Sequence, residues 1–243
     1  MEVTLLAYTP APLKVIYTAA RTCYSARSPA EIWADEVPEE KMEDLVNRLI
    51  QQGHHSVLEH VSFTLGIAGI SRSCLAQLTR HRVGIAFSVQ SQRYVRLDRP
   101  TFVTPPSLGL DGEQRARFEA AMAEAWQVYN ELISAGVAPE DARFVLPNAA
   151  TCNLVLTVNI RELIHICELR LCPRAQWEIH QLFLKVTAEV VKVAPFLKRH
   201  LVPKCLRMGY CDEPESCGIM PHWRELQAQG RLPNPVSRLQ DNG

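Results

Sequence analysis

Hydrophobic residues recur along much of the chain at the spacing of an amphipathic helix. The clearest case lies between Pro38 and Gly53, where apolar residues stand at i, i+3, i+4, i+7 and i+8, namely Met42, Leu45, Val46, Leu49 and Ile50. Residues at this spacing share one face of a helix, and proline before and glycine after it are typical of a helix start and end. The same reasoning predicts further helices over 12–23, 71–81, 111–135, 139–146, 159–171 and 173–195.

Shorter runs rich in β-branched and aromatic residues predict strands over 2–7, 61–70, 87–97 and 150–158. In the third of these, alternation places Arg93 on the same face as Phe87 and Val89. Such an arginine needs a charged partner, because an unpaired buried ion is strongly destabilising. Strands and helices are interspersed without regular βαβ units. The pattern therefore predicts an α+β fold with a mainly antiparallel sheet packed against helices.

The composition is that of an ordinary globular protein, with 243 residues, 47% hydrophobic and 21% charged. No linker or repeat divides the chain, so we predict one domain over 1–200, and an irregular extension over 201–243, where proline and glycine replace the apolar pattern. The N-terminal segment has no basic region before an apolar core, and no apolar run is long enough for a membrane span. These features predict a cytoplasmic protein with no membrane role, whose eight cysteines are reduced thiols.

The formal charge is zero, with 26 basic and 26 acidic residues, so no global field attracts nucleic acid. Charge is concentrated locally instead. Between Ser71 and Pro100 the chain has six arginines, the single acid Asp98 and no lysine. A guanidinium makes paired hydrogen bonds to phosphate or carbonyl oxygens, so this patch indicates an oxygen-rich or phosphorylated ligand. A solvated charged surface is the alternative interpretation.

Arg170 is the second unusual charge. It lies at the edge of the apolar stripe of the helix over 159–171, so it points partly toward the core. It either extends its charged end to solvent or meets a ligand. Arg161 and His165 are i, i+4 neighbours on another face of this helix, and Asn159 can cap its start.

Metal sites and common catalytic motifs are not supported by the spacing. In the cluster of His54, His55, Glu59 and His60, the last two histidines are five residues apart, whereas helical zinc motifs place them four apart. The C-terminal set of Cys205, Cys211, Cys217 and His222 has the composition of a zinc site but lacks its short cysteine pairs, so we predict no metal site and leave this set open. The chain also lacks a phosphate-binding P-loop, a dinucleotide-binding glycine motif and a hydrolase nucleophile elbow.

Four blocks of sequence resemble the flavin-dependent thymidylate synthase family, in the order in which that family has them. They are GHHSVLEH at 53–60, RHRVGIAFSVQSQRY at 80–94, ARFVLP at 142–147 and NIRELIHICELR at 159–170. Together they span most of residues 20–195. The spacer of eight residues between Arg82 and Ser91 is one longer than the commonest family form, and Val89 stands where the family often has an acid or amide. The register of Ser88 to Gln90 is therefore open.

The resemblance implies that the protein methylates dUMP to dTMP. The carbon would come from methylenetetrahydrofolate, and FAD reduced by NADPH would carry the hydride. The implied fold is an α+β domain assembled as a homotetramer with active sites between subunits.

The resemblance also implies roles for individual residues. Arg170 would bind the uracil edge and promote loss of the N3 proton, and His54 would position or gate the substrate. Ser91 is a candidate nucleophile, but no nearby base is evident to activate its hydroxyl, so hydrogen bonding to the phosphate or uracil is the preferred role. The residues implied to contact FAD are Ser56, Arg80, His81, Arg82, Asn159, Ile160, Arg161 and His165. The residues implied to contact dUMP are Gln77, Leu78, Thr79 and Arg80 of one subunit, Val89, Gln90, Ser91, Gln92, Arg93 and Arg143 of another, and Arg170.

A non-catalytic nucleotide-binding or RNA-binding protein that uses the basic patch from Arg80 to Arg93 is the alternative. RNA binding favours exposed aromatic residues among basic ones and a basic domain. Only Phe87 and Tyr94 lie among the arginines between Ser71 and Pro100, and the chain is neutral, so the sequence favours the enzyme.

Overall fold

A computed structural model of the chain describes residues 1–109 and 112–231. At its centre is a four-stranded sheet in the order β1-β2-β4-β3, in which every neighbouring pair is antiparallel. The strands are β1 (Glu2–Tyr8), β2 (Ser62–Ser71), β3 (Ile85–Val89) and β4 (Thr151–Asn159). The prediction of an α+β fold with an antiparallel sheet is confirmed.

Helices surround this sheet. In the described residues the longer ones are α1 (Pro12–Thr22), α3 (Glu39–Gln51), α5 (Glu113–Ser134), α7 (Ile160–Arg170) and α8 (Trp177–Val193). Shorter α-helices are α2 (Pro29–Ala34), α4 (Arg72–Leu78), α6 (Pro139–Ala142), α9 (Lys204–Met208) and α10 (Trp223–Ala228). Four 3-10 turns complete the set, namely η1 (Ser56–His60), η2 (Pro106–Leu108), η3 (Arg143–Val145) and η4 (Pro195–Leu197). Among the helices described, none has the length and apolar character needed to cross a membrane.

Within residues 1–109 and 112–231, helices cover one face of the sheet and leave the other open. Helices α4, α7 and α8 lie on the covered face, and the alternate residues of β4 that face them, from Cys152 to Val158, are buried. On the opposite face Asn153 is exposed and Val155 is 39% exposed. The period of two in β4 thus separates the core side of the sheet from an open side.

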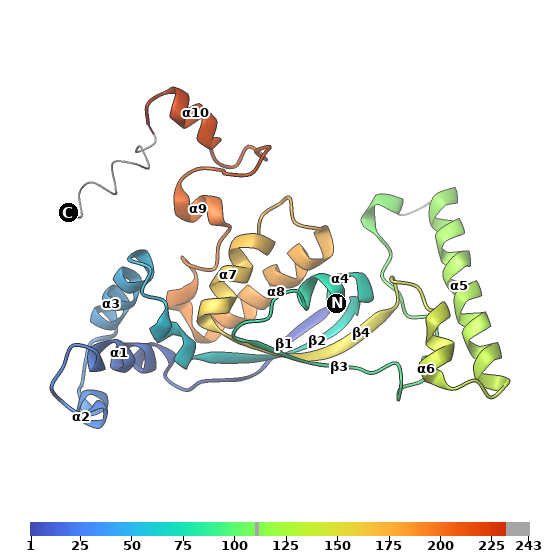
Figure 1. Ribbon diagram of the computed structural model, residues 1–243, viewed down its shortest axis with the longest axis horizontal. Coiled ribbons are helices and arrows are strands. Elements are labelled where there is room, and N and C mark those ends of the chain that lie inside the picture. The colour runs from blue at the N-terminus through green and yellow to red at the C-terminus, as the bar shows by residue number, and fades with distance from the viewer. Residues whose placement is uncertain (110–111, 232–243) are drawn as a thin grey trace.

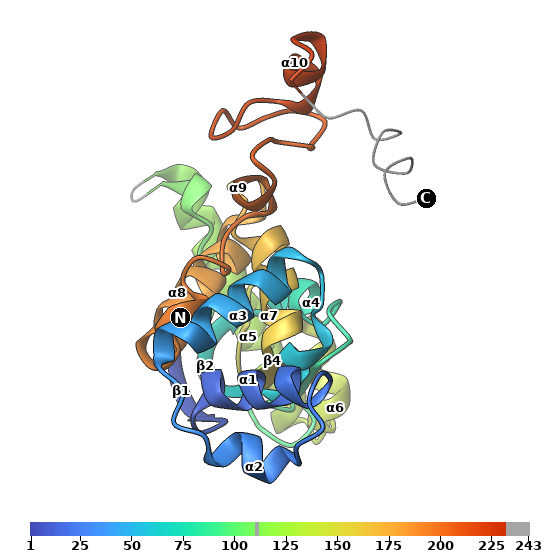
Figure 2. The ribbon, with the colours of Figure 1, turned by 90° about the vertical axis from the view of Figure 1, so that its left-hand side faces the viewer.

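The two ends of the sheet carry different helices (Figure 1). Helices α1 to α3 pack at one end, whereas α5 and α6 form a unit at the other. The C-terminal segment that contains α9 and α10 rises away from the sheet on the side of α7 (Figure 2).

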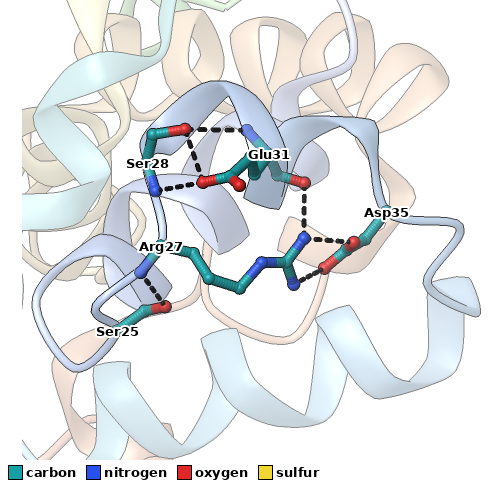
Figure 3. A network of polar contacts seen from close by, with 5 residues as sticks. All are labelled: Ser25, Arg27, Ser28, Glu31 and Asp35. Atoms are coloured by element: carbon teal, nitrogen blue, oxygen red, sulfur yellow. Dashed lines mark hydrogen bonds and ion pairs between the residues drawn. The ribbon is translucent and has the colours of Figure 1, made fainter.

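Helix α2 is an element that the sequence analysis missed. Ser28 accepts a hydrogen bond from the Glu31 main-chain N–H, and the Glu31 carboxylate accepts one from the Ser28 N–H, which is a capping box (Figure 3). Arg27 then pairs with Asp35 at the other end of the helix at 2.7 Å. The Ser-Pro-x-Glu pattern at 28–31 is the signal that could have located this helix, because six residues are too few for a hydrophobic period.

Other boundaries also differ from the predictions. The strand predicted over 87–97 is wrong beyond Val89, since β3 runs from Ile85 to Val89 and turns follow it. Helix α8 begins at Trp177 instead of 173. The Gln176 side chain caps its start by accepting hydrogen bonds from the Glu178 and Ile179 N–H groups. The segment after His200, predicted as irregular, holds the short helices α9 and α10 between loops as far as residue 231, and the remainder of that prediction lies outside the described residues.

Candidate functional site

Three basic residues from two segments meet at the centre of the molecule. His81 follows α4 and is only 6% exposed, and Arg170 is the last residue of α7. The Arg170 Nε–H donates a hydrogen bond to His81 Nε2 at 3.2 Å. Arg80 lies close enough to shift the pKa values of both residues. The hydrophobic pattern of the sequence placed Arg170 at the edge of an apolar stripe. The structure shows this residue half-buried, with its guanidinium directed at His81.

The electrostatics of this group are those of crowded cations. Burial lowers the pKa of His81 to about 4, and the charge of Arg170 adds to that effect, so the imidazole is neutral at pH 7. Burial also lowers the pKa of Arg170, followed by the positive charge of Arg80. Arg80 is exposed, and an anion bound beside the two guanidinium groups would screen the repulsion between them.

A buried carboxylate holds the segment that carries Arg80 and His81. Ser71 caps α4, and its Oγ accepts a hydrogen bond from the Cys74 N–H at 3.0 Å. Glu178 of α8, 2% exposed, accepts from the Ser71 N–H at 2.7 Å and from the Ser71 hydroxyl at 2.5 Å. The start of α4 is therefore attached to α8, and His180 of α8 donates from Nδ1 to the Arg170 carbonyl at 3.0 Å. One helix thus fixes both sides of the site.

Next to this group lies a pocket of about 460 Å³ at the start of α7. Its lining includes Asn159, Arg161 and His165, three of the residues implied to hold a flavin. The His165 ring meets the His81 ring edge-on, with centroids 6.2 Å apart. The pocket therefore adjoins the Arg170 group through His165, and its volume is in the range of small-molecule sites.

The floor of this pocket requires glycine at position 84. Gly84 has a φ of 69°, and a Cβ there would approach the Asn159 side-chain nitrogen to 2.5 Å. The Gly84 carbonyl accepts from the Asn159 N–H at 2.9 Å, while Asn159 Oδ1 caps α7 by accepting from the Glu162 N–H at 2.9 Å. The absence of a side chain at Gly84 thus allows the cap that was predicted for Asn159.

A second group of predicted residues gathers at α6. The Arg93 Nε lies 2.5 Å from a Glu140 carboxylate oxygen, and the Arg143 Nε–H donates to the Glu140 carbonyl at 2.9 Å. Arg93 has the charged partner that the sequence required, but the expected burial on a strand face is wrong, because the side chain is 55% exposed on a turn after β3. The aromatic residues beside these arginines are strongly exposed, with Tyr94 at 78% and Phe144 at 83%.

The structure separates the two groups along its long axis. Figure 1 shows α6 at one end of the molecule, whereas α7 lies over the middle of the sheet. The six arginines from Arg72 to Arg99 therefore do not form one surface. Arg80 belongs to the central group and Arg93 to the α6 group, while Arg72 donates to the Gln90 carbonyl at 3.4 Å.

The remaining predicted residues lie between or beside these groups. The side chains of Leu78 and Ile160 are fully buried in the core, so a ligand contact at these positions would have to use main-chain atoms. Half-buried positions are Gln77, Thr79, Val89, Gln90, Ser91 and Gln92, and exposed positions are His54, Ser56 and Arg82. Ser91 Oγ accepts from the Arg93 N–H at 3.1 Å, which fixes the turn after β3. The Arg82 Nε–H donates to the Thr79 carbonyl at 2.9 Å.

No three histidine, cysteine, aspartate or glutamate side chains within residues 1–109 and 112–231 are placed to hold a metal ion. In the C-terminal set, His222 Nε2 lies 2.8 Å from the Glu213 carbonyl, and its Nδ1 accepts from the Arg224 N–H at 3.3 Å. Cys205 lies near Cys172 and Cys211, whose proximity adds to burial in raising its thiol pKa.

Three glutamates of the site were missed by the sequence analysis. Glu162 lies 3.3 Å from His81 Nδ1, Glu178 holds Ser71, and Glu140 joins Arg93 to Arg143. The partners of the first two are 81 and 107 residues distant in sequence, so no local pattern indicates them. Glu162 had one usable signal, since an acid three residues after a capping asparagine marks a helix start.

Comparison with known proteins connects this geometry to a family. The family model described as "Thymidylate synthase complementing protein" matches residues 4–196. The flavin-dependent thymidylate synthase of Nitratidesulfovibrio vulgaris is 41% identical over 234 residues, which cover 90% of this chain and 95% of that protein. The flavin-dependent thymidylate synthase of Geobacter sulfurreducens is 43% identical over 219 residues, which cover 88% of this chain and 91% of that protein.

Among solved structures, the chain is similar to a UMP/dUMP methylase, PolB, from Streptomyces cacaoi bound with 5-Br dUMP. The TM-score is 0.71 with 23% identity, and the match covers 83% of this chain and 96% of that one. This likeness supports the fold.

Proposed function

Because the chain belongs to the family of flavin-dependent thymidylate synthases, we propose that it methylates dUMP to dTMP, taking the carbon from methylenetetrahydrofolate and using FAD reduced by NADPH. Membership of this enzyme family favours catalysis over the alternative of a non-catalytic nucleotide-binding or RNA-binding protein. All of the proposed substrates are soluble charged molecules, which fits action in the cytoplasm.

The observation that carries the proposal is the half-buried Arg170 beside Arg80 and the neutral His81. Since Arg170 Nε is used by His81, the terminal nitrogens of the guanidinium are the ones that meet a ligand. A planar fork of this kind matches the carbonyl and ring nitrogen edge of uracil. Negative charge develops on that edge when the N3 proton leaves and C5 becomes nucleophilic. A fixed guanidinium in a site with little water stabilises this charge strongly, which is the proposed catalytic role of Arg170.

The residues of the pocket at the start of α7 fit a flavin dinucleotide. Arg161 and Arg207, which pair with the pocket carboxylates Glu59 and Glu168, and His165 would supply hydrogen-bond donors for phosphate groups. Gly84 keeps the floor open for a close approach. Ser56, Ile160 and the segment from Arg80 to Arg82 adjoin this pocket along the chain and complete the proposed flavin contacts. When bound, FAD supplies the hydride that completes the methyl group.

The remaining substrate contacts are proposed for the turn after β3 and for α6. Ser91 is already oriented by its bond with the Arg93 N–H, and it would hydrogen-bond the phosphate or the uracil. Arg93 and Arg143 would bind the phosphate, and Gln77 with Arg80 would meet the nucleotide from the other side. His54 follows α3 in an exposed position, and we assign it to positioning or gating of the substrate.

We further propose that these two sets of contacts come from different subunits of a homotetramer. The support is the separation of α6 from α7 within one chain (Figure 1) and the strong exposure of Tyr94 and Phe144 beside the arginines. Exposed aromatic residues of this size commonly become buried at interfaces between chains.

The visible absorption spectrum of the purified protein tests the proposal directly. After reconstitution with FAD we expect the two bands of bound oxidised flavin, a change in these bands on addition of dUMP, and dTMP formation when methylenetetrahydrofolate and NADPH are present. A folded protein that binds no flavin, or that binds it without forming dTMP, would refute the proposed function.

Mixing of two inactive variants tests the shared site. We expect Arg170→Ala and Arg143→Ala to be poorly active alone, because each removes one half of every site. Co-expression should restore activity to about a quarter of the wild-type value, since random assembly of equal amounts joins two intact halves in about one site in four. Co-expression of two tagged copies of Arg170→Ala is the control, and no gain in the mixed sample would show that each site lies within one chain.

A further inference from the structure

His81 lies between two side chains of the same helix. On one side its Nε2 accepts the hydrogen bond from Arg170, and on the other its Nδ1 lies 3.3 Å from Glu162 Oε1. Glu162 and Arg170 are eight residues apart on α7, a distance of about 12 Å along the helix axis. The imidazole therefore bridges two side chains that reach toward it, the Glu162 carboxylate from the first turn of α7 and the Arg170 guanidinium from its end.

The two contacts of the His81 ring determine which of its nitrogens carries the proton. A neutral imidazole has one N–H and one acceptor nitrogen, so acceptance from Arg170 at Nε2 leaves the proton on Nδ1, facing Glu162. Burial raises the pKa of Glu162, while burial and Arg170 lower the pKa of His81 to about 4. The ring therefore stays neutral and keeps its acceptor through the physiological pH range.

Glu162 itself is held in place. Its main-chain N–H donates to the Asn159 side chain, and its carboxyl group is only 12% exposed. The main chain of Arg170, at the other end of α7, is held as well, because the His180 side chain hydrogen-bonds the Arg170 carbonyl. Glu162 and Arg170 belong to α7, and His81 follows α4, whose start is held by Glu178, so the path is supported by packed helices, as a fixed guanidinium requires.

We propose that Glu162 is a positioning residue: by holding the His81 ring in the tautomer that accepts from Arg170, it aims the Arg170 guanidinium at the pyrimidine base. The inference rests on the proposed function, because that function supplies the base. In this role Glu162 acts on the substrate only through His81, although its side chain also lines the pocket at the start of α7.

Three substitutions of Glu162 separate this role from a general effect of charge. Glu162→Gln keeps an acceptor oxygen of the same reach and should remain within about threefold of the wild-type kcat, since one neutral acceptor replaces another. Glu162→Ala removes the acceptor, and Glu162→Asp keeps the charge but falls short of His81. Both should lower kcat by about 10-fold to 100-fold, the cost of a small misplacement of a catalytic group.

Measurements of dUMP binding show whether Glu162 acts through Arg170. We expect Glu162→Ala to raise the Kd for dUMP, measured by calorimetry on protein saturated with FAD, so that a change in flavin affinity caused by this pocket-lining residue does not enter the comparison. In an Arg170→Ala background the same substitution should leave the Kd for dUMP unchanged, because the guanidinium that it positions is gone. An equal rise in Kd in both backgrounds would overturn the proposal, since it would mean that Glu162 acts independently of Arg170.

The control is Glu189→Ala, which removes a helical glutamate that pairs with Lys192 on the outer surface of α8. If wild-type protein binds dUMP and forms dTMP while Glu162→Ala and Glu162→Asp behave like this control, the positioning role is wrong and the proposed function stands. If wild-type protein neither binds dUMP nor forms dTMP, the proposed function fails first.

Discussion

Replacement of Arg170 by alanine is expected to abolish dTMP formation while leaving the protein folded and flavin-bound. The reason is geometric: Arg170 is the half-buried cation beside Arg80, and its Nε is already committed to His81. Loss of one preorganised donor of this kind costs about 100-fold to 1000-fold in kcat. The flavin residues Asn159 and Arg161 are at the other end of α7, so flavin content measured by visible absorption should be unchanged.

Two further variants show whether charge alone is sufficient at this position. Arg170→Lys keeps a cation but loses the planar fork and the Nε–H that meets His81, so it should remain close to the alanine variant in activity. Arg117→Ala, which removes an exposed arginine of α5, should retain wild-type kcat. An Arg170→Ala enzyme that keeps more than about a tenth of wild-type activity is incompatible with a stabilising role of the size that such donors have.

The helices that were predicted correctly have an apolar stripe that continues over several turns or a clear N-terminal capping residue. Helix α3 follows its five-residue apolar stripe, and α4 and α7 start where Ser71 and Asn159 indicated caps. The strand predicted beyond Val89 failed because alternation of apolar and polar residues does not show whether a neighbouring strand exists. Strand β4 pairs with β3 only as far as Val89, and the chain then turns toward α6.

For the site, the sequence indicated which cations are unusual but not what holds them. Arg170 was recognisable because a charge at the edge of an apolar stripe is rare. Its connection through His81 to Glu162 was not recognisable, since it depends on the packing of α4 on β2 and α8 and of α7 on β4 and α8. In the same way, Arg93 and Arg143 were both candidates, but only the folded chain shows that Glu140 holds them together.

The second large effect is expected from Glu178→Ala and concerns stability. The carboxylate is 2% exposed and accepts two hydrogen bonds from Ser71, so its removal leaves the buried Ser71 N–H without a partner and opens a cavity between α4 and α8. An unsatisfied buried donor costs about 1–3 kcal/mol, and the cavity adds to it, so we expect a loss of about 3 kcal/mol. For a chain of this size the loss corresponds to a fall in Tm of about 6–12 °C.

Thermal denaturation followed by circular dichroism measures this effect, and the choice of variants makes it specific. Glu178→Gln keeps an acceptor for the Ser71 N–H and should lose less stability than the alanine variant, while Glu189→Ala on the outer face of the same helix should have nearly the wild-type Tm. Because Glu178 also fixes the start of the segment that carries Arg80 and His81, the folded fraction of Glu178→Ala should bind dUMP more weakly at temperatures well below its Tm. Wild-type dUMP affinity in that variant would mean that packing of α4 on β2 alone orients the site, and that Glu178 contributes to stability without positioning the catalytic group.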